Sequence, residues 1–150
     1  MRNPLDTLSS MQEARFPLTL PARLEERIAF YRRYLEAGLR FGRDHPDRYH
    51  LLVYEQLCQE PEHALATLMC WLGERFDPRQ LAFNEEPRGD GLEDFKVKFT
   101  EGVHASSVGR WGANLAESDA ALIWEGTRDL WEQVDPGLRW SYRQPQGCRP

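Results

Sequence analysis

Long hydrophobic runs are missing from this sequence, since no stretch approaches the roughly 20 consecutive apolar residues that a membrane-spanning helix needs. No apolar segment with basic flanks opens the chain, as a secretory signal would. An excess of positive charge is missing as well: 24 acidic residues outnumber 19 basic ones, and the formal net charge is -5. Dedicated nucleic-acid-binding proteins usually carry a basic face. These absences predict a cytoplasmic protein that neither spans a membrane nor binds nucleic acid.

Cysteine and histidine are not arranged in a pattern that suits a metal ion. The three cysteines, Cys58, Cys70 and Cys148, are an odd number at no metal-like spacing. The four histidines are scattered, without the HExxH spacing of zinc sites. Cys70 lies in the apolar run ALATLMCWL, where a buried free thiol is expected. We therefore predict no bound metal and a reducing environment.

What the sequence does have is helical periodicity. Apolar and charged residues make up 41% and 29% of the 150 residues, which suits one folded domain. Apolar spacing predicts four helices: from Asn3-Pro4 to the stretch RFPLTLP, from Ala22 to Phe41, from Pro61 to Gly73, and from Ser118 to Val134. Residues 84 to 106 are polar and glycine-rich, and predict a long loop.

One stretch, RYHLLVYEQL, predicts a strand. His50 to Tyr54 is a short apolar run between polar turn residues, as in a buried parallel strand, and we place the strand at about 49 to 54. A lone strand cannot satisfy its own backbone groups. Its natural partner would be a strand just upstream of Arg2, so the sheet is expected to lack its N-terminal half. A homodimer that pairs these strands is one way to cover the exposed edge.

The stretch RNPLDTLSS, Arg2 to Ser10, has the features of an anion site at the start of a helix. Asn3 can cap the helix and Pro4 suits its first position. A helix N-terminus offers free N–H groups and a partial positive charge. Arg2 adds a forked cation suited to phosphate, and Ser10 adds a hydroxyl on the face of the cap. The alternative is a plainly capped helix with Arg2 in solvent.

Three further stretches follow in a recognisable order: LLVYEQLCQEPEHALATLMCWLGERFDP, SSVGRW and NLAESDAALIWEGTRDLWEQV. Together with RNPLDTLSS they resemble the C-terminal half of the cytosolic-type and bacterial sulfotransferases, which use 3'-phosphoadenosine 5'-phosphosulfate (PAPS). The resemblance covers nearly the whole chain. It implies an α/β fold with three layers, similar to that of P-loop proteins, of which residues 1–150 would be one partial domain, mostly helical with one core strand.

The resemblance also implies a cofactor site. Arg2 and Ser10 correspond to the family's arginine and serine that hold the 3'-phosphate of the nucleotide, and Tyr54 to a tyrosine that packs by the adenine. In SVGRW, Gly109 would allow close backbone approach and Arg110 would contact the same phosphate. The alternatives are that Tyr54 is an aromatic residue closing a core strand, and that Arg110 is a surface cation before a tryptophan.

The sequence departs from the family in the part that transfers the sulfuryl group. The family's glycine-rich, lysine-containing loop around the 5'-phosphosulfate has no counterpart here, because no GxxxxGK or GxxKxG occurs. Neither His45 nor His104 lies where the family has its general base. The expected function is therefore sulfuryl transfer from PAPS to a hydroxyl or amine acceptor, with this chain inactive alone. The alternative is a non-catalytic helical interaction module derived from a nucleotide-binding fold.

Overall fold

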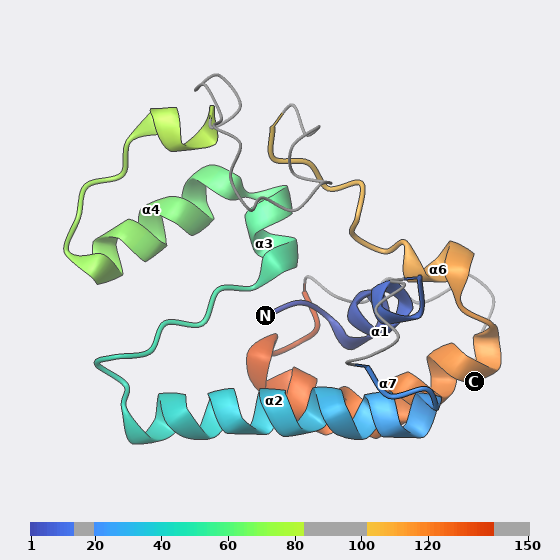
Figure 1. Cartoon of the computed structure of the whole chain (residues 1–150). Coiled ribbons are helices and arrows are strands. Elements are labelled where there is room, and N and C mark those ends of the chain that lie inside the picture. Colours follow the sequence, from blue (N-terminus) through green and yellow to red (C-terminus); the bar gives the residue numbers. More distant parts are fainter. Residues whose placement is uncertain (14–19, 83–101, 140–150) are drawn as a thin grey trace.

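The computed structural model describes residues 1–13, 20–82 and 102–139, and helices dominate all three ranges (Figure 1). The elements in chain order are α1 (Pro4–Glu13), α2 (Leu24–Asp44), α3 (Tyr54–Gln59), α4 (Pro61–Leu72), the 3-10 helix η1 (Pro78–Leu81), α6 (Trp111–Asn114) and α7 (Glu117–Val134). The four predicted helices are confirmed, with ends shifted by a few residues. The predicted loop at 84–106 lies largely outside the described residues.

The core lies where α1, α2 and α7 meet. Helices α2 and α7 run side by side, and α1 packs across both (Figure 1). The fully buried side chains include Leu5 and Leu8 of α1, Leu35 of α2, and Ile123 and Trp131 of α7. Ile28 and Tyr31 of α2 are buried with Leu35, so in each helix the buried apolar residues recur at helical spacing and form one stripe.

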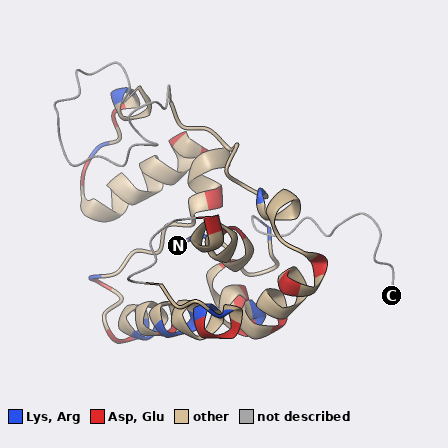
Figure 2. Cartoon of the chain, turned by 45° about the vertical axis from the view of Figure 1, so that its right-hand side comes forward, with Lys and Arg blue, Asp and Glu red and all other residues tan. Residues whose placement is uncertain are grey.

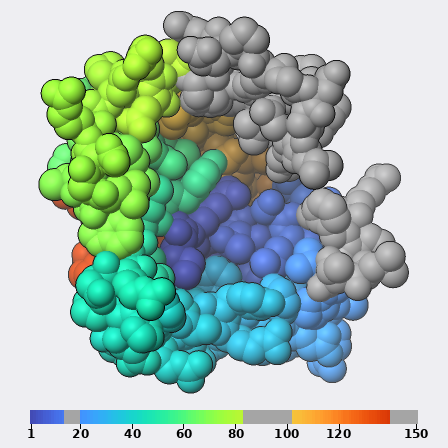
Figure 3. Space-filling model, turned by 60° about the vertical axis from the view of Figure 1, so that its left-hand side comes forward, coloured from blue at the N-terminus to red at the C-terminus, as the bar shows by residue number. Residues whose placement is uncertain are grey.

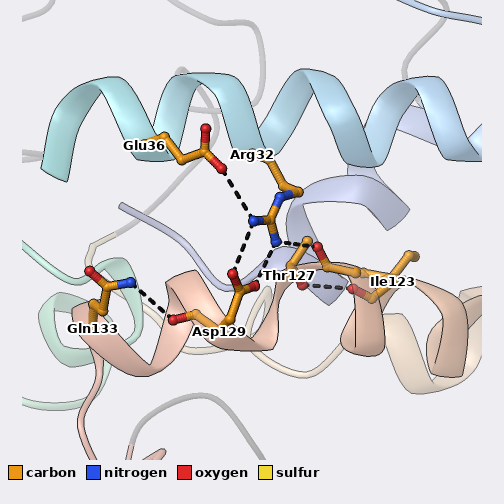
Figure 4. A network of polar contacts seen from close by, with 7 residues as sticks. Arg32, Glu36, Ile123, Thr127, Asp129 and Gln133 are labelled. Carbon is orange, nitrogen blue, oxygen red and sulfur yellow. Dashed lines mark hydrogen bonds and ion pairs between the residues drawn. The ribbon is translucent and has the colours of Figure 1, made fainter. Parts of the chain in front are cut away.

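A polar network ties α2 to α7 at the edge of this core (Figure 4). The guanidinium of Arg32 donates to the backbone oxygen of Gly126 at 2.7 Å and to both carboxylate oxygens of Asp129, at 2.6 and 2.9 Å. The same bonds hold the pKa of the Asp129 carboxyl below its ordinary value. The Ile28 side chain of α2 packs directly on the α7 backbone here, because a Cβ built on Gly126 would lie 2.9 Å from Ile28 Cγ2.

Helices α3, α4 and η1 form an arm that stands beside the core. Pro61 occupies the first turn of α4, and Gly73 ends it in the left-handed conformation, with φ 77°. Among the described helices, α4 makes its main contacts with α3 and η1 only. Trp71 and Leu72 are therefore exposed, and so is Cys70, for which the prediction of a buried thiol was wrong.

The predicted strand at 49–54 is wrong, and with it the α/β fold class. No residue in the described ranges belongs to a strand, and Tyr54 is the first residue of α3. The extended segment before it does pair with Met1: the Met1 amine donates to the Leu52 oxygen, and the Tyr54 N–H donates to the Met1 oxygen, 2.7 Å away. This is the bonding pattern of a parallel ladder. It stops after one residue because Asn3 already caps α1, so the chain turns into a helix.

The described helices together carry charges of both signs, and none of them is suited to a membrane span. Acidic and basic residues are interspersed along α2 (Figure 2). None of the described helices combines the length and apolar character needed to cross a bilayer.

Candidate anion-binding site at the start of α1

Arg2 lies where three segments meet, immediately before α1. Its Nη2 donates to the backbone oxygen of Ser107 at 2.6 Å, and its guanidinium carbon lies 5.0 Å from the centre of the Tyr54 ring. Its own backbone oxygen accepts from the Tyr31 hydroxyl at 2.9 Å. The alternative with Arg2 in solvent is therefore wrong, because the side chain is half-buried and held by α3 and by the segment before α6.

The cap of α1 forms as the sequence predicts. The Asn3 side-chain oxygen accepts from the backbone N–H of Asp6 at 2.8 Å, and Pro4 is the first helical residue. Asn3 and Asp6 are polar, yet both are only 1% exposed. They are buried because polar partners from distant segments cover them.

Asp6 is the hub of those contacts. Its Oδ2 accepts from the backbone N–H of Gly109 at 2.7 Å, and its Oδ1 accepts from the backbone N–H of Trp111 at 3.0 Å. The Asn3 amide also donates to Oδ2, at 2.8 Å. Every one of these bonds is charge-assisted, a class that is shorter and stronger than neutral hydrogen bonds.

The turn before α6 carries the predicted residues Gly109 and Arg110. Gly109 has φ 76°, a conformation that side chains rarely adopt, and a Cβ at this position would meet no described atom within 4 Å. The requirement for glycine therefore comes from its backbone conformation. Arg110 is exposed, and its Nη2 lies 3.3 Å from Glu13 Oε2 at the end of α1. The Asn114 amide donates to the same carboxylate.

A buried glutamate supports Asn3 from the other side. Glu55 is fully buried, and its Oε1 accepts from the backbone N–H and the side-chain amide of Asn3, at 2.9 and 2.7 Å. Its Oε2 is buried without a hydrogen-bond partner among the described residues. Burial raises the pKa of the Glu55 carboxyl, although the bonds from Asn3 oppose the shift. Burial likewise raises the pKa of the adjacent Tyr54 hydroxyl.

Contacts within the described residues thus join three of the five predicted site residues, Arg2, Tyr54 and Gly109. Arg110 follows Gly109 in the chain, but its side chain pairs with Glu13 at the end of α1. Ser10 is half-buried on α1, and no hydrogen bond within the described ranges joins it to either arginine. Figure 3 shows the hollowed face on which the first residues of the chain, in dark blue, lie between α2 and the arm of α3 and α4.

The acidic members of this network, Asp6, Glu13 and Glu55, were not predicted from the sequence. One signal was available: in Asn3-Pro4-Leu5-Asp6 the acidic residue falls on the third helical position, the position that pairs with the cap. The partners of Asp6 in the turn before α6, Gly109 and Trp111, lie more than 100 positions away, and local spacing carries no information about them.

Comparison with known proteins gives no relative: no family model, curated protein or solved structure matches this chain. Within the described ranges, no three histidine, cysteine or acidic side chains gather in a way that could hold a metal ion.

Proposed function

We propose that this chain is the 3'-phosphate-binding portion of a PAPS-dependent sulfotransferase, a cytoplasmic enzyme that transfers a sulfuryl group to a hydroxyl or amine. In this proposal Arg2 and Arg110 bind the 3'-phosphate, and Tyr54 packs by the adenine. One observation carries it: the Arg2 guanidinium lies on the Tyr54 ring and bonds to Ser107, three residues before Arg110. Segments distant in the sequence thus bring Arg2 and Tyr54 together with the segment that precedes Arg110.

The chemistry of these groups suits a phosphate. Arginine offers a planar fork of donors that matches phosphate oxygens. Arg2 has an unused donor, because its Nε is buried with no hydrogen-bond partner in the described part of the chain. Leaving a buried polar group unpaired costs about 1–3 kcal/mol, which a phosphate oxygen would recover. No described atom would lie within 4 Å of a Cβ at Gly109, so the described residues leave room for a ligand beside this backbone.

Two features limit the site as it stands. Glu13 pairs with Arg110, so a phosphate must displace a carboxylate to reach this guanidinium. No hydrogen bond in the described part of the chain joins Ser10 to either arginine, so its role stays a prediction. Both features make the expected affinity depend mainly on Arg2.

PAPS, when bound, supplies the activated sulfuryl group, and the residues of this chain would hold its nucleotide end. The sequence has no glycine-rich lysine loop for the 5'-phosphosulfate and no assigned general base. Since oriented electrostatic groups supply most of the rate in group transfer, we expect no sulfuryl transfer by the 150-residue chain alone. The acceptor in this proposal is a small molecule, a glycan or a peptide that carries a hydroxyl or amine.

The test is calorimetric titration of the chain with 3',5'-ADP and with 5'-AMP, which lacks the 3'-phosphate. We expect saturable binding of 3',5'-ADP and at least roughly tenfold weaker binding of 5'-AMP, since a charge-assisted contact contributes about 1.5–3 kcal/mol. Arg2→Lys keeps the charge but loses the fork, and should reduce the preference. Arg128→Ala, which removes an exposed arginine on α7, is the matched control. Equal affinity for the two nucleotides, or no binding, would overturn the proposal.

A second candidate function is a helical interaction module. The exposed Trp71 and Leu72 favour it, since they form the end of an apolar helix that few other helices cover. This candidate predicts no saturable nucleotide binding, so the same titration separates the two.

A further inference from the structure

We infer that Asp6 is a positioning residue, which fixes the backbone of residues 109–111 against α1 and so sets the distance between the two arginines of the proposed phosphate site. The expected effect of Asp6 on nucleotide affinity rests on the proposed function. Its structural part, the attachment of the turn to α1, stands on the contacts of Asp6 alone.

Asp6 binds the turn through both oxygens of its carboxylate. One carboxylate oxygen accepts from Gly109 N–H at 2.7 Å and the other from Trp111 N–H at 3.0 Å. Arg110 is the residue between these two anchors. Two anchored neighbours fix the position and direction from which the Arg110 side chain leaves the backbone.

The carboxylate itself has no freedom to rotate. Asp6 is 1% exposed, and the Asn3 amide donates to its Oδ2 at 2.8 Å. Asn3 is in turn held by two bonds to the buried Glu55. These supporting hydrogen bonds hold the Asp6 carboxylate in the orientation in which it accepts from the backbone N–H groups of the turn. Glu55 thus positions Asn3, Asn3 positions Asp6, and Asp6 positions the turn.

Arg2 belongs to the same arrangement, because it immediately precedes Asn3 and bonds to the backbone oxygen of Ser107, two residues before Gly109. Both ends of the turn before α6 are therefore attached to the start of α1, one through Arg2 and the other through Asp6. Glycine at position 109 permits the attachment through Asp6. Its N–H binds Asp6 while its backbone has a positive φ of 76°, which residues with a side chain rarely adopt.

The experiment compares Asp6→Asn with a matched control, Asp77→Asn. Asparagine keeps the size of the side chain, but its NH2 group must face one of the two backbone N–H donors. Asp77 also accepts a backbone N–H, from Arg79 at 2.9 Å, but it caps η1 in the arm. For each variant we would measure amide hydrogen exchange at Gly109 and Trp111 by NMR, and the affinities for 3',5'-ADP and 5'-AMP.

If Asp6 positions the site, Asp6→Asn speeds amide hydrogen exchange at Gly109 and Trp111. It also lowers the affinity for 3',5'-ADP by roughly tenfold or more, while the affinity for 5'-AMP changes little. Asp77→Asn leaves both readouts unchanged. Equal weakening of the two nucleotides would mean that Asp6 acts only through folding, and unchanged 3',5'-ADP affinity despite faster exchange would mean that the turn is attached without effect on the site. Either result overturns the inference while the proposed function stands, since the wild type still prefers 3',5'-ADP. A wild-type chain that binds neither nucleotide overturns both.

Discussion

Arg110 and Glu13 form an ion pair across the gap between α6 and α1, with 3.3 Å between Arg110 Nη2 and Glu13 Oε2. The side chains are 49% and 37% exposed, so the pair lies at the surface, where such pairs contribute about 0–1 kcal/mol to stability. Because this ion pair is weak, a phosphate that binds Arg110 more strongly can replace the Glu13 carboxylate. In the proposed site, the carboxylate of Glu13 therefore competes with the nucleotide phosphate for the same guanidinium.

The first prediction is that Glu13→Gln strengthens 3',5'-ADP binding. The change removes the competing carboxylate and its repulsion of the phosphate, and we expect a gain of roughly two- to fivefold, the equivalent of up to about 1 kcal/mol. Glu132→Gln removes an acidic partner from the exposed Arg128 of α7 and should change nothing. Calorimetric titration at low salt measures the effect, and a weaker affinity in Glu13→Gln would contradict the role of Arg110.

The helices could be predicted because their signals are local. Leu24, Ile28, Tyr31, Leu35 and Leu39 recur at helical spacing, and the structure buries Ile28, Tyr31 and Leu35 and packs the other two against the core. Caps and breakers such as Pro61 and Gly73 act on their own neighbours, so the ends of α4 follow from the sequence.

The strand prediction failed because a short apolar run does not determine its own partner. Residues 50–53 belong to no helix and Val53 has an extended backbone, but a ladder needs successive residues on both sides, and α1 begins too soon after Met1 to supply them. The acidic half of the candidate site escaped prediction for a similar reason. Asp6, Glu13 and Glu55 gain their roles from contacts with distant segments, which local spacing does not encode.

The second prediction concerns pH and Glu55. Burial raises the pKa of this carboxyl above its ordinary value of 4.5. The folded protein then holds the proton more tightly than the unfolded chain, so the contribution of Glu55 to stability falls as the pH rises from 4.5 through the raised pKa. Glu55→Gln lacks this titration and keeps the acceptor oxygen for Asn3. The free energy of unfolding of the variant, relative to wild type, should therefore increase with pH above 4.5 in urea denaturation.

The control for this measurement is Asp129→Asn. The bonds from Arg32 lower the pKa of Asp129 below its ordinary value of 3.8, so its stabilising contribution is present above that value and is lost as the pH falls through the lowered pKa. The difference between Asp129→Asn and wild type should thus stay constant over the range in which the Glu55→Gln difference rises. A constant difference for Glu55→Gln as well would mean that Glu55 is not desolvated.

The third prediction tests the packing of α2 on α7. Gly126→Ala adds a Cβ that would lie 2.9 Å from Ile28 Cγ2, which is attached directly to the stiff part of that side chain. Overpacking costs about 1–3 kcal/mol, while alanine gains up to about 1 kcal/mol of helix propensity over glycine. We therefore expect a net loss of about 1 kcal/mol in the free energy of unfolding. Gly112→Ala in α6, where a Cβ meets no described atom within 4 Å, should not destabilise the protein; equal effects of the two changes would contradict this packing.

The last prediction uses the cysteines to test how the arm sits on the core. Cys70 is exposed at the end of α4, whereas Cys58 in α3 is half-buried, and burial raises the pKa of its thiol. The thiolate is the reactive species, so both its smaller fraction and its poorer access slow Cys58. In a Cys148→Ser background, iodoacetamide at neutral pH should modify Cys70 at least roughly tenfold faster than Cys58. In urea the two rates should converge, which shows that the difference comes from the fold. If Cys58 reacted as fast as Cys70 in the native protein, α3 would not be held against the start of α1, and the stacking of Arg2 on Tyr54 would have to be abandoned with it.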